Sequence, residues 1–109
     1  VTATRMISFF IADSAVLSSR HIPPRVSIIV PARNEAGNLP ALLTSLCALD
    51  YPDYEIIVVD DASDDDTFAV ASAYPARVLR AGVKPAGWVG KSWACHAGAG
   101  VATGQYLLF

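Results

Sequence analysis

Short runs of apolar, largely β-branched residues alternate along the chain with stretches in which apolar residues recur at helical spacing. The first pattern predicts buried strands, and the second predicts amphipathic helices. We expect strands at residues 26–30, 55–59, 76–80 and 105–109, and helices at residues 39–47, 63–74 and 92–102. Strands that alternate with helices pair in parallel through right-handed crossovers. The pattern therefore predicts an α/β fold with a mostly parallel sheet, whose last strand is buried.

Polar residues follow the predicted strands at the points where a ligand is expected. In open sheets of this type, ligands bind beyond the carboxyl ends of the strands. The residues that would lie there fall into three groups: Pro31, Ala32, Arg33, Asn34 and Glu35 after the first strand, Asp60 and Asp61 after the second, and Gly90 and Lys91 ahead of the third helix.

The adjacent carboxylates of Asp60 and Asp61 would repel each other unless their side chains point in opposite directions. We therefore expect one of them to brace a loop and the other to face a ligand. Lys91 lies between a glycine-rich loop and a helix start, a position that suits an anion, although a solvated surface lysine is the alternative. Ser63 and Asp66 fit a capping box for the second helix.

Composition narrows the class of protein. The 109 residues suffice for one small domain. The chain has 53% apolar and 17% charged residues, a composition that excludes a disordered chain. Its net charge of −2 excludes non-specific electrostatic binding to nucleic acid. Cys47 and Cys95 are far apart in helix-like stretches, so we expect core thiols in a reducing compartment rather than a disulfide framework or a zinc site. His96 is isolated and fits a helix face or the core better than a metal site.

Both ends of the sequence suggest a fragment of a longer protein. The chain begins at Val1 and ends on an apolar run at Phe109. We expect residues 1–24 to be an amino-terminal segment and linker. Within it, residues 6–17 fit the trailing edge of an upstream membrane anchor or a short amphipathic helix. No uninterrupted apolar run reaches the roughly 18 residues that a membrane-spanning helix needs.

Three segments together resemble the family 2 glycosyltransferases. They are VSIIVPARNE at residues 26–35, IIVVDDASDDDT at residues 56–67, and Gly90-Lys91 with Ala94, Gly98, Ala102 and Gly104 before YLLF at residues 106–109. The resemblance covers residues 25–109. The stretch PAGWVGKSWA at residues 85–94 is more narrowly similar to the branch linked to hopanoid and carotenoid biosynthesis.

The resemblance implies the Rossmann-like first half of a GT-A fold and a binding site for a nucleotide-diphosphate sugar. It assigns Pro31, Ala32, Arg33 and Glu35 to the nucleotide pocket. Asp61 would accept a hydrogen bond from the base, since an ionised carboxylate is an acceptor only, and Lys91 would approach the diphosphate as a point charge. His96 stands where the family often has Asn.

The resemblance also implies what the parent protein does. It would be an inverting transferase that passes the sugar to an acceptor hydroxyl, with a lipid as one option, in the cytoplasm or at the cytoplasmic face of a membrane that missing segments would contact. A divalent ion, Mg²⁺ or Mn²⁺, would be held by an Asp-x-Asp motif expected beyond Phe109. We therefore assign no catalytic or metal-ligating residue within this chain and expect the chain alone to be inactive.

Three other classes remain open from the residues. One is a non-catalytic nucleotide-binding module, and another is an inactive truncated remnant. A phospho-acceptor receiver domain also carries paired acids at a strand end, but there the pair follows the first strand, whereas Asp60 and Asp61 follow the second. The position of the two acids after the second strand therefore disfavours a receiver domain.

Overall fold

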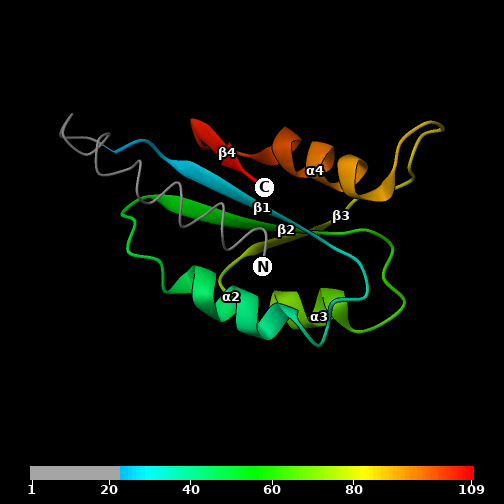
Figure 1. Ribbon diagram of the computed structural model, residues 1–109, viewed down its shortest axis with the longest axis horizontal. Coiled ribbons are helices and arrows are strands. Elements are labelled where there is room, and N and C mark those ends of the chain that lie inside the picture. The colour runs from blue at the N-terminus through cyan, green and yellow to red at the C-terminus, as the bar shows by residue number, and fades with distance from the viewer. Residues whose placement is uncertain (1–22) are drawn as a thin grey trace.

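A computed structural model describes residues 23–109 as a four-stranded parallel sheet with helices on both faces (Figure 1). The strands follow the order β3-β2-β1-β4 across the sheet. Their bounds are β1 Val26–Ala32, β2 Tyr54–Asp60, β3 Arg77–Arg80 and β4 Tyr106–Leu108. The helices are α2 Leu39–Cys47, α3 Thr67–Ser72 and α4 Gly90–Val101. The predicted α/β class and parallel pairing are confirmed.

The register of β1 against β2 aligns their carboxyl ends. Val26 is the partner of Tyr54, and Ala32 is the partner of Asp60. The amide of Asp61 then donates to the carbonyl of Ala32 at 2.9 Å. The segments that follow β1 and β2 therefore leave the sheet side by side, at the edge where parallel sheets bind ligands.

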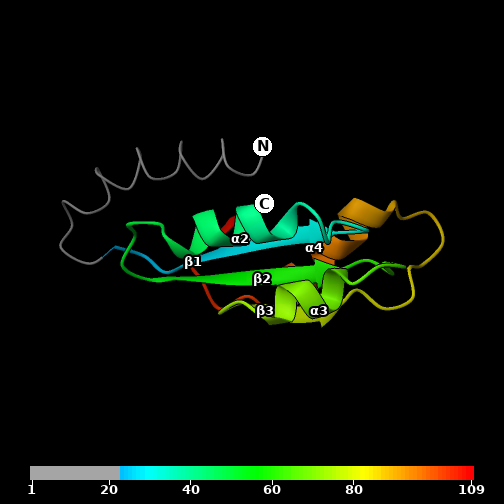
Figure 2. The ribbon, with the colours of Figure 1, turned by 90° about the horizontal axis from the view of Figure 1, so that it is seen from below.

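Both faces of the sheet are covered, which explains the uninterrupted β-branched runs. Alternate residues of the two central strands, such as Ile28 and Val58, pack toward α2 and α3. Their neighbours, such as Ile29 and Ile57, pack toward α4. Figures 1 and 2 show the two layers of helices on opposite sides of the strands.

Small residues let α4 lie close against the sheet. Ala94 is fully buried. A Cβ atom at Gly98 would lie 2.6 Å from Cγ2 of Ile29 and 3.1 Å from Cγ2 of Val59. Side chains of ordinary size at these positions would push the helix away from β1 and β2.

The second predicted helix is shorter than expected. It begins at Thr67 rather than Ser63, and the predicted capping box is wrong. The residue at the N-cap, Asp66, makes no side-chain capping bond. The hydroxyl of Ser63 instead accepts a hydrogen bond from the amide of Asn34 at 2.9 Å. Residues 63–66 therefore form a loop that is bonded to the loop after β1.

The third predicted helix begins two residues earlier than expected. Val89 is its N-cap, and α4 starts at Gly90. Gly90 and Lys91 are thus the first two residues of the helix and do not precede it. The first helix has the predicted bounds, residues 39–47.

Two predictions of burial are wrong. In β4 only Leu108 is buried, while Tyr106 and Leu107 are 47% and 42% exposed. Among residues 23–109, β4 is one of the two edge strands and pairs with β1 alone. Cys47 is exposed, since the buried residues of α2 are Leu39, Leu43 and Leu46. Cys95 is half-buried, and burial raises the pKa of its thiol.

The segment predicted to be a membrane anchor or amphipathic helix, residues 6–17, lies outside the described residues. Within residues 23–109, no helix has the length and apolar character needed to cross a bilayer.

Candidate nucleotide-binding site

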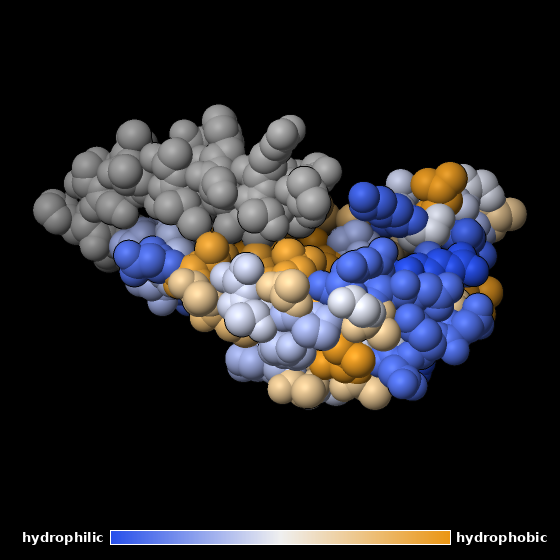
Figure 3. Space-filling model, turned by 60° about the horizontal axis from the view of Figure 1, so that its bottom comes forward, coloured by the Kyte–Doolittle hydropathy of each residue, from blue (hydrophilic) through white to orange (hydrophobic). Residues whose placement is uncertain are grey.

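A cavity of about 370 Å³ opens at the carboxyl ends of the strands. Hydrophilic residues gather at this end of the molecule (Figure 3). The lining of the cavity combines the end of β1 and the segment after it, the residue after β2 and the first turns of α4. Pro31 and Ala32, predicted to follow the first strand, are the last two residues of β1. The lining residues are Pro31, Ala32, Arg33, Glu35, Asp61, Gly90, Lys91 and Ala94. The structure thus brings to one cavity all six residues that the resemblance assigns to the nucleotide site, together with Gly90 and Ala94. Asn34 and Asp60, which the sequence also placed beyond the strands, are not part of the lining.

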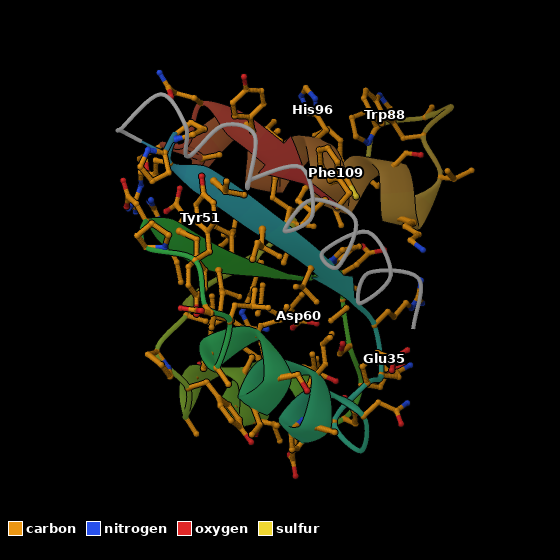
Figure 4. All side chains as sticks on the ribbon, turned by 60° about the vertical axis from the view of Figure 1, so that its left-hand side comes forward. Glu35, Tyr51, Asp60, Trp88, His96 and Phe109 are labelled. Atoms are coloured by element: carbon orange, nitrogen blue, oxygen red, sulfur yellow. The ribbon has the colours of Figure 1, made fainter. Side chains whose placement is uncertain are left out.

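The adjacent acids Asp60 and Asp61 diverge as predicted. Asp60 is 1% exposed. Its carboxylate accepts a hydrogen bond from the amide of Ser63 at 3.2 Å and forms an ion pair with Arg80 at 3.4 Å. Asp61 lines the cavity instead. Figure 4 shows Asp60 within the body of the fold and Glu35 at its rim. One carboxylate therefore braces a loop, and the other is available to a ligand.

Gly90 allows Asp61 to approach the first turn of α4. A Cβ atom at Gly90 would lie 2.4 Å from Oδ2 of Asp61, which is closer than real Cβ contacts allow. The partial positive charge of a helix N-terminus favours a carboxylate there. The same Cβ position lies 3.8 Å from Nζ of Lys84. The side chain of Lys84 thus lies close to Gly90, although it is not part of the cavity lining.

The loop after β1 is fixed by the start of α2 and by the loop before α3. The carbonyl of Glu35 accepts hydrogen bonds from the amides of Asn38 and Leu39 at 3.0 and 2.9 Å. Its carboxylate accepts one from the side-chain amide of Asn38 at 2.9 Å, so Asn38 does not cap the helix with its side chain. The amide of Glu35 donates to the hydroxyl of Thr67 at 2.9 Å. Thr67 is a structural residue of the site that the sequence interpretation missed.

The cavity carries both signs of charge. Arg33 and Lys91 supply cations, and Glu35 and Asp61 supply carboxylates. Carboxylates accept hydrogen bonds from ring N–H groups, and lysine and arginine bind phosphate oxygens. The volume lies within the range of small-molecule sites, roughly 300–1,000 Å³. The arrangement therefore suits a ligand that combines N–H donors with an anionic group.

An aromatic cluster lies outside the cavity lining. The ring of His96 stacks on Trp93, with ring centroids 5.6 Å apart, and lies 5.1 Å from the ring of Trp88. Figure 4 shows His96 and Trp88 close together on the α4 side of the molecule. His96 is exposed on α4 and lies on a helix face.

The described part of the chain offers no ready set of metal ligands. No three His, Cys, Asp or Glu side chains among residues 23–109 come together so as to hold an ion. The described residues of this cavity therefore do not fit a resident metal by themselves.

Comparison with known families identifies the class. The profile of the family described as Glycosyl transferase family 2 matches residues 27–109. The chain therefore belongs to glycosyltransferase family 2.

A named relative lies in the carotenoid-associated branch. The 4,4'-diaponeurosporenoate glycosyltransferase of Staphylococcus haemolyticus is 41% identical over 86 residues, which cover 77% of this chain and 23% of the relative. The chain thus spans about a quarter of the length of this relative. The narrower similarity of residues 85–94 to the carotenoid-associated branch is in line with this match.

Solved structures confirm the GT-A architecture. Glucosyl-3-phosphoglycerate synthase of Mycobacterium tuberculosis aligns with a TM-score of 0.68 and 27% identity over 85% of this chain and 35% of that one. A complex of the same enzyme with Mn²⁺, UDP-glucose and phosphoglyceric acid aligns with a TM-score of 0.65 and 28% identity, covering 77% and 31%.

Proposed function

We propose that residues 25–109 are the donor-binding part of an inverting glycosyltransferase that uses a nucleotide-diphosphate sugar. One observation carries the proposal: Glu35, Asp61 and Lys91, which come from three separate segments, line a single cavity. A solved relative was crystallised with UDP-glucose, which supports this class of donor.

Six of the lining residues have a role in this proposal. Asp61 accepts a hydrogen bond from a ring N–H of the base. Arg33 and Lys91 bind the diphosphate. Pro31 and Ala32 form an apolar wall. Glu35 fixes the loop that carries Arg33, because its carbonyl accepts hydrogen bonds from the amides of Asn38 and Leu39, and its carboxylate accepts one from the side chain of Asn38.

The reaction of the parent protein is a displacement at the anomeric carbon. An acceptor hydroxyl oxygen attacks this carbon, the bond to the diphosphate oxygen breaks, and the hydroxyl proton passes to a general base. The configuration at the anomeric carbon is inverted. A divalent ion, Mg²⁺ or Mn²⁺, would neutralise the leaving diphosphate, as the Mn²⁺ complex of the solved relative suggests. We assign neither the base nor a metal ligand to a residue of this chain, and we expect no turnover from it alone.

The name of the carotenoid-acting relative supports a lipid as acceptor. An apolar acceptor of this kind is dissolved in a bilayer, so we place the parent protein at a membrane surface, on its cytoplasmic face.

Calorimetry on the 109-residue chain with UDP and with GDP tests the proposal. We expect binding of one nucleotide, and a loss of affinity of about 10- to 100-fold in Asp61→Ala, because hydrogen bonds to charged groups contribute roughly 1.5–3 kcal/mol. Asp64→Ala is the matched control, because it removes the same charge from an exposed position outside the cavity lining. If neither nucleotide binds, or if both variants lose affinity equally, the proposed site is wrong.

A transfer assay on the same chain with Mg²⁺ or Mn²⁺ tests the expected inactivity. Turnover that disappears in Asp61→Ala would contradict it.

A further inference from the structure

A buried hydroxyl on α3 joins the loop before α3 to the loop after β1. Thr67 is fully buried. Its hydroxyl accepts a hydrogen bond from the amide of Glu35 at 2.9 Å and donates one to the carboxylate of Asp65. The second carboxylate oxygen of Asp65 accepts one from the amide of Ala36 at 3.3 Å. Two consecutive amides of the loop after β1 are therefore held by side chains of residues 65–67.

A second pair of bonds joins the same two loops. The amide of Asn34 donates to the hydroxyl of Ser63 at 2.9 Å, and the side-chain oxygen of Asn34 accepts from the amide of Asp64 at 2.8 Å. Asn34 and Ala62 both have a φ of 53°, a left-handed conformation that non-glycine residues adopt when their surroundings impose it. The conformation of the loop after β1 thus depends on contacts with residues some 30 positions later.

We propose that Thr67 and Asp65 are positioning residues for the nucleotide pocket. They fix the peptides of Glu35 and Ala36, and thereby direct Arg33 and Glu35 into the cavity. This inference rests on the proposed function. Neither Thr67 nor Asp65 lines the cavity, so any effect on nucleotide binding must pass through the loop after β1.

An ordinary helix cap does not account for this arrangement. The N-cap residue of α3 is Asp66, and it makes no side-chain capping bond. Asp65 does accept a bond from the amide of Thr67 at 3.0 Å, but its other oxygen bonds to Ala36 in a different segment. The hydroxyl of Thr67 likewise accepts from Glu35 rather than from its own helix.

Four variants separate positioning from stability. Thr67→Val keeps the shape of the side chain and removes the hydroxyl, while Thr67→Ser keeps the hydroxyl. Thr44→Val is the matched control, because the hydroxyl of Thr44 is exposed and bonds only within α2, to the carbonyl of Pro40 at 2.7 Å. Asp65→Asn is a second variant at an exposed position, where the fold should tolerate the change even if Thr67→Val does not fold.

Two readouts are measured on each folded variant: hydrogen exchange of the Glu35 and Ala36 amides, and affinity for UDP and GDP. In Thr67→Val we expect exchange at Glu35 to rise at least 10-fold relative to the amides of β1, and affinity for the bound nucleotide to fall at least 10-fold. Thr67→Ser should behave like the wild type, as should Thr44→Val. Asp65→Asn should move both readouts in the same direction as Thr67→Val, by a smaller factor.

The outcomes distinguish this inference from the proposed function. If the wild type binds a nucleotide and Thr67→Val binds it equally well, the positioning role is wrong and the proposed function stands. If the wild type binds neither nucleotide, the proposed function fails, and the role in nucleotide binding fails with it. Unchanged exchange at Glu35 in both Thr67→Val and Asp65→Asn overturns the inference whatever the binding data give. A merely structural role would lower the melting temperature without a selective effect on Glu35.

Discussion

Glu55 lies away from the cavity, at the amino end of the sheet, and its carboxylate accepts several hydrogen bonds. It accepts hydrogen bonds from the hydroxyl of Ser27 and from the amide and hydroxyl of Thr103, at 2.7 and 2.8 Å for the latter two. A guanidinium nitrogen of Arg25 lies 3.7 Å away. Burial alone would raise the pKa of Glu55. The hydrogen bonds and the charge of Arg25 outweigh this effect and hold the pKa of the carboxyl below its ordinary value of 4.5.

This lowered pKa predicts a pH dependence of stability. Because the folded-state pKa lies below the unfolded one, ionised Glu55 stabilises the fold fully above pH 4.5, and this contribution disappears as the pH falls through the folded-state pKa. We expect Glu55→Gln to lower the free energy of unfolding at pH 7 by about 2 kcal/mol, and to make stability depend less steeply on pH below pH 4.5. Urea unfolding at pH 7 and at pH 3 measures both effects.

Asp53→Asn is the control for this prediction, because Asp53 also pairs with Arg25 but its side chain is 51% exposed. It should change stability little. An unchanged pH dependence in Glu55→Gln would show that the pKa of this carboxyl is not lowered by folding.

At the scale of single residues, the sequence predicted the cavity lining better than the bonds that hold it. Arg33 and Asp61 could be found because parallel strands bring the residues that follow them to one edge. Lys91 could be found because it lies between a glycine-rich loop and a helix start, a position that suits an anion. Thr67 could not be found in this way, because its role depends on a hydrogen bond to Glu35, 32 residues away. The position of Lys84 near Asp61 could not be predicted, because it depends on the path of a loop without periodicity.

At the scale of elements, the close packing of α4 on the sheet predicts opposite effects on stability for two glycine substitutions. We expect Gly98→Ala to lower the free energy of unfolding by about 1–3 kcal/mol, because its Cβ would lie 2.6 Å from the side chain of Ile29. Gly100→Ala on the same helix meets nothing within 4 Å and should raise stability by roughly 0.5–1 kcal/mol, as alanine favours helices over glycine. Chemical denaturation of both variants measures the difference.

Equal effects of the two substitutions would contradict close packing of α4, since helix propensity alone would make both of them stabilising. The pair therefore isolates the contact with the sheet from the intrinsic preference of the helix.

Periodicity predicted the interior of each element and failed at some ends. The apolar spacing of α2 placed its bounds at residues 39–47, as observed. The start of α3 was misplaced because residues 63–66 bond to the loop after β1 and so cannot continue the helix. The apolar composition of residues 105–109 predicted burial, but burial requires a covering layer as well as apolar side chains. Within the described residues, α4 packs mainly on β1 and β2.

At the scale of the whole molecule, one end of the sheet carries the candidate site and the other carries a stabilising hydrogen-bond network. The carboxyl end holds the cavity and the loops that Thr67 joins. The amino end holds the network around Glu55, which binds the turn before β4 to β1 and β2. This separation means that substitutions at Glu55 should change stability and leave nucleotide affinity unchanged.

The exposed edge at β4 predicts self-association of the 109-residue chain. Tyr106, Leu107 and Phe109 are 37–47% exposed, and an apolar edge strand is a template for pairing with another chain. We expect sedimentation velocity to show species larger than a monomer that increase with concentration. Leu107→Lys should shift the distribution toward monomer, because a charge on an edge strand opposes pairing.

Val83→Lys is the matched control, since Val83 is 93% exposed in the loop before α4 and should leave association unchanged. A single monomeric species at all concentrations would show that β4 is not a pairing edge, and an equal effect of both substitutions would mean that net charge alone governs solubility.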